Sequence, residues 1–424
     1  MRLNRLEEAE KALESALDIH KQVNYRVGEA NDHRVLGKLY MRLNRLEEAE
    51  KALESALDLH KQVDDRLGEA NDHRDLGKLY MRLNWLEEAE KALQSALDLH
   101  KQVNDGLGEA NDYRHLGKLY MRLNLLEDAE KALQSALHLH QQVNASLSEA
   151  NDLRDLGQLY MRLNRLEDAE KALQSALDLH QQVSDRLGEA NDNRDLGKLY
   201  MRLKRLEDAE NALQSALDLH QQVNARLSEA NDLRDLGKLY MRLTRHEDAE
   251  KALQSALEFH TQVNDRLGEA NDHRHLGKLY VRLNRLEDAE KALQSAHDLY
   301  QHVKSRLGEA NALQQLGQLY TRLNRLEDAE KTLQSAVEIH KQVNERLGEA
   351  NDHQHLGKLY MRLNQLEDAG KALQFALDLY QQVKSRLGEA NSLHQLGKLH
   401  IRLNRLEDAD KVLDHQKGID TTLA

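Results

Sequence analysis

The sequence predicts an all-α fold, an α-solenoid of ten antiparallel helix pairs, and two observations carry that prediction. A 40-residue pattern recurs without insertion or deletion, so that Gly77 and Tyr80 return as Gly237 and Tyr240. Within each repeat, apolar residues are spaced by three and four, which is the period of an amphipathic helix. Repeats of roughly 20 to 50 residues stack so that each unit buries its apolar face against its neighbours. We therefore expect function on a long repeated surface rather than in one pocket.

Helix A, the first helix of each pair, covers residues 67–83 in the second repeat and has the tighter packing demand. Gly77 lies in its interior, where glycine costs about 1 kcal/mol relative to alanine. The same position holds glycine in every repeat from Gly37 to Gly397. We therefore expect helix A to cross its partner too closely there for a methyl group. The apolar and small positions of this helix are Leu67, Ala70, Leu76, Gly77, Leu79, Tyr80 and Leu83.

Helix B follows over residues 86–103 with the same spacing, at Leu86, Ala89, Leu93, Ala96, Leu97, His100 and Val103. Asn84 precedes it and Glu87 follows three residues later, which is the pattern of a capping box. The pair recurs as Asn44/Glu47, Asn124/Glu127 and Asn284/Glu287. In two other repeats the asparagine is replaced, by Thr244, which can also cap a helix, and by Lys204, which cannot. Because the chain has no proline, we expect Gly, Asn, Asp or Ser to form every bend.

The composition excludes several classes of protein. The 424 residues include no cysteine, which rules out disulfides, thiolate metal sites and cysteine nucleophiles. With 60 Lys and Arg against 73 Asp and Glu, the net charge of −13 disfavours a protein that coats nucleic acid or anionic lipid. The sequence shows neither a signal peptide nor an apolar run long enough to span a membrane. We expect a cytoplasmic protein without a membrane partner.

The sequence indicates no enzyme, metal or cofactor. Twenty-two histidines invite a metal hypothesis, yet pairs such as His273 and His275 are two residues apart on a helix and point to different faces. The recurring Leu-Gly-Lys-Leu-Tyr lacks the earlier glycine and the following Ser or Thr of a phosphate-binding loop. Paired carboxylates such as Glu87 and Glu88 belong to the first turn of a helix, where its dipole favours them. We expect no catalytic residue.

One family resemblance follows from these positions. Leu-Gly, Tyr, Ala, Leu and Ala in this order resemble the tetratricopeptide repeat over essentially the whole chain, and in the second repeat they are Leu76, Gly77, Tyr80, Ala89, Leu93 and Ala96. Asn84 replaces the usual turn glycine, His73 stands where tryptophan is common, and about six extra residues replace the helix-ending proline. The longer period is similar to arrays in kinesin light chains, Pins-type adaptors and fungal STAND-type NTPases. The resemblance implies a right-handed superhelix whose concave face, lined by helix A, holds peptides or partner proteins.

We interpret residues 1–424 as a single solenoid domain. Residues 1–24 form an orphan helix B, residues 25–413 the ten-repeat array, and residues 414–424 a divergent cap or tail. Terminal repeats usually carry a polar cap, but the orphan helix has an uncovered apolar face at Leu6, Ala9, Leu13, Ala16 and Val23. We therefore expect either a fragment of a longer protein or an end that associates with another copy of the chain.

A basic ladder runs along the surface of helix A that the family geometry turns inward. Arg74, Lys78 and Arg82 stand at i, i+4 and i+8, so three like charges share one helix face. Asparagine occupies the position of Asn71 in all ten repeats. The predicted peptide-binding residues are these four and their equivalents, namely Asn111, Arg114, Lys118 and Arg122, then Asn191, Arg194, Lys198 and Arg202, and then Asn231, Arg234, Lys238 and Arg242.

Two interpretations of the ladder stay open. Its cations are either solvated or paired with carboxylates such as Asp75, or they form a groove that captures an acidic segment. The asparagine row is either a clamp for a peptide backbone or a hydrogen bond within the helix. The ladder breaks at Gln158, Gln314, Gln354 and His394, where a specific partner should be sought.

The function that the sequence favours is a non-enzymatic scaffold that binds a protein or peptide segment, acidic in the finer hypothesis. The rival from another class is the sensor arm of a larger STAND-type signalling NTPase whose catalytic domain is absent here. An RNA-binding array is the third hypothesis. Overall acidity and an aromatic content of 4% disfavour it, because few rings are present to stack on bases.

Overall fold

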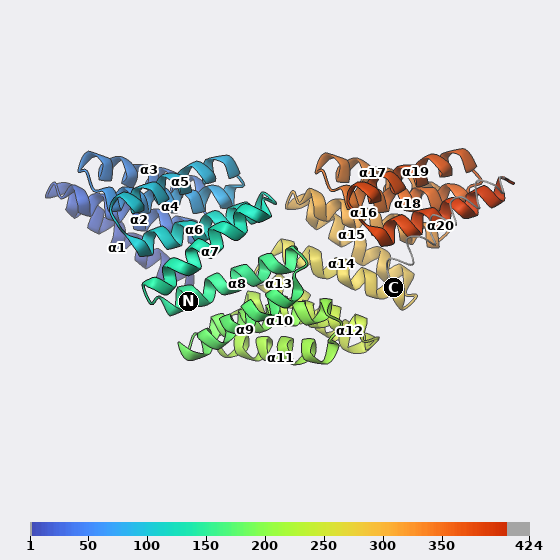
Figure 1. Ribbon diagram of the computed structural model, residues 1–424, viewed down its shortest axis with the longest axis horizontal. Helices are drawn as coiled ribbons and strands as arrows, with labels where there is room; N and C mark the ends of the chain where they lie inside the picture. The colour runs from blue at the N-terminus through green and yellow to red at the C-terminus, as the bar shows by residue number, and fades with distance from the viewer. Residues whose placement is uncertain (1, 405–424) are drawn as a thin grey trace. The chain divides into compact units, whose positions relative to one another are not determined.

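The computed structural model describes residues 2–404, which form α-helices joined by short turns, without a strand in that range (Figure 1). The predicted tail 414–424 lies outside the described residues. The chain divides into two compact units, Met1–Leu219 and His220–Ala424.

The helices alternate between the two predicted types, with even numbers for helix A and odd numbers for helix B. From the start to the boundary between the units they are α1 (Arg2–Gln22), α2 (Arg26–Arg42), α3 (Leu46–Gln62), α4 (Arg66–Leu83), α5 (Leu86–Gln102), α6 (Gly106–Arg122), α7 (Leu126–Gln142), α8 (Ser146–Arg162), α9 (Leu166–Gln182), α10 (Arg186–Arg202) and α11 (Leu206–Gln222). The second unit contains α12 (Arg226–Arg242), α13 (His246–Gln262), α14 (Arg266–Arg282), α15 (Leu286–His302), α16 (Arg306–Arg322), α17 (Leu326–Gln342), α18 (Arg346–Arg362), α19 (Leu366–Gln382) and α20 (Arg386–Arg402).

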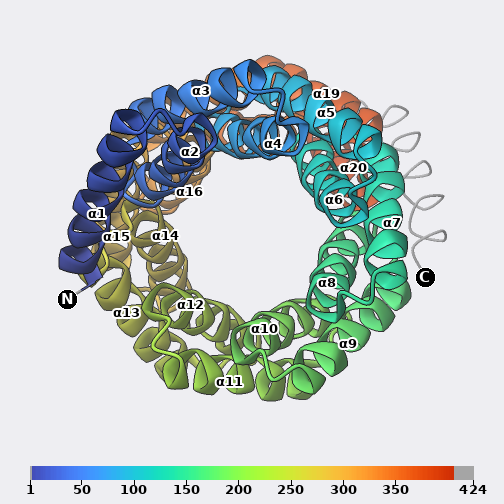
Figure 2. The ribbon, with the colours of Figure 1, turned by 90° about the vertical axis from the view of Figure 1, so that its left-hand side faces the viewer.

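Each unit is a stack of helix pairs. Consecutive helices pack together, and even-numbered helices also contact the next even-numbered helix, as α4 contacts α6 and α14 contacts α16. In the first unit, Figure 2 shows α4, α6, α8 and α10 on the inner side of a curve and α5, α7 and α9 on its outer side. This arrangement confirms the predicted α-solenoid.

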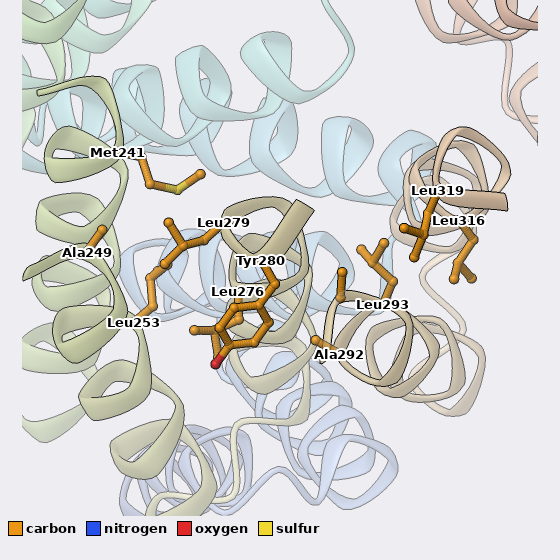
Figure 3. Close-up of a cluster of buried hydrophobic side chains, with 11 residues drawn as sticks. Met241, Ala249, Leu253, Leu276, Leu279, Tyr280, Ala292, Leu293, Leu316 and Leu319 are labelled. Carbon is orange, nitrogen blue, oxygen red and sulfur yellow. The ribbon is translucent and has the colours of Figure 1, made fainter. Parts of the chain in front are cut away.

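The core is a continuous series of small and branched apolar residues between successive pairs. In the second unit, Leu276, Leu279 and Tyr280 of α14 lie between Leu253 of α13 and Leu293 of α15 (Figure 3). Leu253, Leu279 and Leu293 have no exposed surface. Burial of this kind is the main favourable term in folding, and here each repeat depends on its neighbours for it.

The recurring glycine marks the predicted close crossing of helices A and B. A Cβ added at Gly77 would lie 2.6 Å from Cγ of Leu93 and 3.4 Å from the carbonyl oxygen of Ala89. The first of these distances is also 2.6 Å at each equivalent glycine from Gly37 to Gly357. The prediction that no methyl group fits there is confirmed.

The turns correct the capping prediction. Asn84 has a left-handed backbone, with φ of 63°, and ends α4, whereas Trp85 takes the N-cap position of α5 without a side-chain hydrogen bond. The amide of Trp85 donates to the carbonyl of Tyr80 at 2.9 Å, which is a common way to end a helix on a left-handed residue. The capping box predicted for Asn84 is therefore wrong, and it is wrong for Asn44, Asn124 and Asn284 too, because each of these asparagines supplies a left-handed turn.

Left-handed residues recur at every twentieth position from Asn24 to Asn404, with φ between 52° and 63°. Asparagine tolerates this conformation better than most side chains. Lys204 and Thr244 nevertheless adopt it with φ of 61° and 59°, and no glycine of the described range does. The expectation that only Gly, Asn, Asp or Ser would form the bends is wrong, because the surrounding packing imposes the turn.

A buried polar layer also joins the repeats. His60 of α3 and Asp72 of α4 are both fully buried, with Nδ1 2.5 Å from Oδ2. Burial raises the pKa of Asp72, although the hydrogen bond with His60 acts in the opposite direction. The fully buried pair recurs as His100–Asp112, His140–Asp152, His180–Asp192, His220–Asp232, His260–Asp272 and His340–Asp352.

The two partners of this pair are replaced together. Where tyrosine occupies the histidine position, at Tyr300 and Tyr380, the aspartate position holds Ala312 or Ser392. The hydroxyl of Tyr300 donates to Oδ1 of Asn271 at 2.9 Å, within the preceding helix A. The tyrosine therefore satisfies its polar atom without the aspartate, as buried polar groups require.

The glycine crossing can be tested within one helix. Gly117→Ala should lower the free energy of unfolding by about 1–3 kcal/mol, because the new Cβ would lie 2.6 Å from Cγ of Leu133. Gly106→Ala, at the start of the same helix, should change it by less than about 0.5 kcal/mol, because its Cβ meets only Val143, at 3.7 Å. Urea denaturation followed by circular dichroism measures both. Equal effects of the two substitutions would contradict the close crossing.

The paired replacement predicts a rescue. Asp152→Ala should cost about 2–3 kcal/mol, because it leaves the buried imidazole of His140 without its partner. Adding His140→Tyr reproduces the Tyr300 and Ala312 pair and should restore most of that loss by placing a hydroxyl near Asn111. The same denaturation measurement checks this. A double variant no more stable than Asp152→Ala would count against the paired role.

Candidate functional site

The predicted ladder residues lie on the even-numbered helices, where they bridge successive repeats. Asn71, Arg74, Lys78 and Arg82 belong to α4, and their equivalents belong to α6, α10 and α12. Because the even-numbered helices contact one another within each unit, the basic side chains of one repeat reach carboxylates of the next repeat and carbonyls of the preceding one. We call this surface the helix-A face.

The first arginine of the ladder reaches toward the buried aspartate of the following repeat. Nη1 of Arg74 lies 3.6 Å from Oδ1 of Asp112, and Nη1 of Arg234 lies 3.5 Å from Oδ1 of Asp272. Nε of Arg114 is 3.5 Å from Oδ1 of Asp152. At these three pairs the arginine extends the His–Asp contact toward the surface, whereas at His340–Asp352 Gln314 takes its place and donates to Oδ1 of Asp352 at 2.5 Å.

The lysine of the ladder pairs with a second aspartate. Asp75 is 2% exposed, accepts from Lys78 at 3.0 Å and forms an ion pair with Lys38 of the preceding repeat at 2.8 Å. Burial acts to raise the pKa of Asp75, but the two ammonium groups outweigh it and hold that pKa below its usual value. Lys118 makes the pair between repeats, with Asp155 at 2.9 Å. The pair within one helix is made by Lys198 with Asp195, at 3.2 Å, and by Lys238 with Asp235, at 2.8 Å.

The last arginine of the ladder connects helix A to the preceding repeat. Nη1 of Arg82 donates to the carbonyl of Met41 at 2.5 Å, and Nη2 donates to Oδ1 of the turn residue Asn44 at 3.2 Å. Arg122 and Arg202 make the equivalent contacts with Met81 and Asn84 and with Met161 and Asn164.

The asparagine row forms hydrogen bonds within its own helix. Nδ2 of Asn71 donates to the carbonyl of Leu67 at 2.8 Å, and its Oδ1 accepts from Arg74. The first of these bonds is also made by Asn111, Asn191 and Asn231. Of the two roles considered for this row, the described contacts are those of the helix hydrogen bond.

The helix-A face is hollowed in the second unit. One hollow of 210 Å³ is lined by Lys238, Met241, Arg242, His275, Lys278 and Arg282, and another of 330 Å³ by Lys278, Val281, Leu293, Gln314, Gln315, Gln318, Leu319 and Arg322. Within residues 2–404, no group of three His, Cys, Asp or Glu side chains could hold a metal ion. No described helix has the length and apolar character needed to cross a bilayer.

Sequence reasoning missed one polar contact that recurs along the described residues, the buried His–Asp pair. The signal was present, because histidine and aspartate recur twelve residues apart and disappear together at Tyr300 and Tyr380. A histidine on an apolar helix face is normally interpreted as a core residue, and helical periodicity does not reveal its partner because that partner lies on a different helix. Only the joint substitution could have connected them.

Comparisons with known proteins support the fold. No curated protein matches the sequence of this chain. The apo quorum sensor NprR from B. thuringiensis is similar in structure, with a TM-score of 0.58, 16% identity and coverage of 85% of this chain and 99% of that one. A Rap protein complexed with competence and sporulation factor matches with a TM-score of 0.56, 15% identity and coverage of 84% and 99%.

A STAND protein with a tetratricopeptide repeat sensor, from Pyrococcus horikoshii, matches with a TM-score of 0.55 and 17% identity over 90% of this chain and 54% of that one. Sequence models described as tetratricopeptide repeat match residues 1–62, 32–102, 74–144, 148–222, 228–302, 273–342 and 349–415. The chain belongs to the tetratricopeptide repeat family.

Proposed function

We propose that this chain is a non-enzymatic scaffold that binds an extended or helical protein segment along its helix-A face. The observation that carries the proposal is the combination of hollows and polar side chains on that face. Both hollows described above are lined by residues of even-numbered helices, with Leu293 of α15 the single exception. Concave sites with a few convergent polar groups are the usual places for ligands.

The finer proposal is that the bound segment is acidic. In this proposal the ladder residues Arg74, Lys78 and Arg82, with the asparagine row, line the binding face in each repeat. The side chain of Lys78 remains 34% exposed while its ammonium group is paired with Asp75, and an ammonium group has three donors, so it can also bind a ligand. Charge-assisted hydrogen bonds of this kind are stronger than neutral ones.

A second candidate is the sensor arm of a larger STAND-type signalling NTPase. The structural match to the Pyrococcus horikoshii protein favours it, since this chain spans about half of that one. In this proposal catalysis belongs to a separate domain and the array recognises the signal. An RNA-binding array is a third candidate, which the same binding experiments can test.

Self-association through α1 is a further part of the proposal. Ile19 of α1 and Val23 in the turn after it are 58% and 64% exposed, whereas Leu59, at the position of Ile19 one repeat later, is 8% exposed. An apolar helix face without a covering helix favours association with a second copy. Sedimentation velocity should show a concentration-dependent dimer that Ile19→Glu abolishes. A monomer at all concentrations would exclude this interface.

Binding can be mapped by hydrogen exchange on the full chain. An array of acidic, neutral and basic peptides first supplies a ligand, which should then protect amides of even-numbered helices. Lys78→Gln, Lys118→Gln and Lys278→Gln combined should weaken an acidic ligand about tenfold. The matched control is Lys91→Gln, Lys131→Gln and Lys291→Gln, which removes three exposed lysines from odd-numbered helices and should leave affinity unchanged. Protection confined to odd-numbered helices, or no captured peptide, would overturn the proposal.

A further inference from the structure

Repeat seven has the same basic residues as repeat three, but the repeat that follows it differs. Residues 114–120 and 274–280 have the same sequence, Arg-His-Leu-Gly-Lys-Leu-Tyr. The following repeats differ, because Asp152 and Asp155 after the first copy correspond to Ala312 and Gln315 after the second. The two copies therefore share their cations and differ in the carboxylates available to them.

In repeat three both leading cations are neutralised. Nε of Arg114 lies 2.7 Å from Oδ2 of Asp155, and Nζ of Lys118 lies 2.9 Å from the same oxygen. Asp152 contributes a second carboxylate 3.5 Å from Arg114. These partners belong to α8, the next helix A along the stack.

In repeat seven the corresponding cations lack these partners. Arg274 donates through Nε to the hydroxyl of Tyr300 at 3.2 Å. Lys278 is exposed and forms no hydrogen bond or ion pair with any described residue. Gln315 stands where the aspartate would be, and its Oε1 is buried without a hydrogen-bond partner.

The third cation of this ladder also has an unused donor. Nη1 of Arg282 donates to the carbonyl of Met241 at 2.9 Å. In the repeats of Arg122 and Arg202, the other terminal nitrogen donates to a turn asparagine. The equivalent turn residue here is Thr244, and Nη2 of Arg282 has no hydrogen-bond partner in the described part of the chain.

Lys278 lines both hollows of the helix-A face, which flank α14. In Figure 3, Met241 lies on one side of α14, and Leu293 and Leu319 lie on the other. The 210 Å³ hollow is basic. The 330 Å³ hollow is lined by amide and apolar side chains together with Lys278 and Arg322, and the described residues that line the two hollows include no carboxylate. Although the side chain of Lys278 is exposed, partial desolvation of its ammonium group and the guanidinium groups of Arg282, Arg274 and Arg242 lower its pKa.

We propose that Lys278 and Arg282 form a carboxylate-binding site for an acidic protein segment, with neighbouring residues of that segment entering the amide-lined hollow beside them. This inference rests on the proposed function, and it places the strongest contact with the bound segment at repeat seven. Lys238, which also lines the 210 Å³ hollow, is paired with Asp235 at 2.8 Å. The uncompensated charges are therefore those of Lys278 and Arg282. Nucleic acid is the poorer fit, because neither hollow has a Phe, Tyr or Trp side chain in its described lining for bases to stack on.

The experiment uses the full chain and a fluorescein-labelled peptide of twelve residues in which glutamate alternates with serine. Fluorescence anisotropy measures its dissociation constant at two salt concentrations. Lys278→Gln should weaken binding about tenfold. Gln315→Asp should do the same, because it supplies the carboxylate that repeat four places beside Lys118.

Lys118→Gln is the matched comparison within the same binding face, since it removes the same residue from an identical local sequence in which a carboxylate already neutralises it. It should weaken binding by about twofold, well short of the loss expected for Lys278→Gln. Circular dichroism checks that all three variants keep the helix content of the parent chain. A peptide with glutamine in place of glutamate should not bind.

Several outcomes would overturn the site. Equal losses for Lys278→Gln and Lys118→Gln would show that repeat seven has no special role, while protection of even-numbered helices would still support the proposed function. If a uridine oligonucleotide displaces the acidic peptide and binds more tightly, the ligand class is wrong. If no peptide of any charge protects the helix-A face, the proposed function itself fails.

Discussion

The close crossing of helices A and B at the recurring glycine is the constraint on which the rest of the structure depends. Because Gly77 has no side chain, Leu93 of helix B can approach it closely. A Cβ added at Gly77 would lie only 2.6 Å from Cγ of Leu93. This contact fixes the two helices of a pair in one register. Because each repeat has the same crossing, polar residues at equal positions in successive repeats meet the same kinds of partner. The ion pairs of the helix-A face depend on that regularity.

Most charged side chains of the helix-A face form ion pairs or hydrogen bonds within the stack and are therefore less available to a ligand. The arginine of one repeat approaches the buried aspartate of the next, its lysine pairs with a second aspartate, and its last arginine donates to a carbonyl of the preceding repeat. Removing one partner from a buried network of this kind leaves an uncompensated group. Binding specificity is therefore best sought where the repeats lose a carboxylate and keep the cation, as at Lys278.

The sequence predicted the helix pairs and the glycine crossing because both depend on local spacing. It was wrong about Asn84, because a side chain that can cap one helix can equally end the preceding one, and the choice depends on the geometry of the whole turn. It listed Arg74 and Lys78 as candidates and named Asp75 as a possible partner. The partner of Arg74, Asp112 of the next repeat, became evident only when adjacent repeats were placed side by side.

By itself, the sequence determined the solenoid class, the two helices of each repeat and the face on which the basic residues gather, since these follow from periodicity. Tertiary structure decided which charges are neutralised, because ion pairing depends on distances between atoms of different repeats. The ladders at Lys118 and Lys278 show the difference. Their local sequences are identical, and only the aspartate or glutamine on the next helix makes one lysine a paired group and the other a candidate for binding.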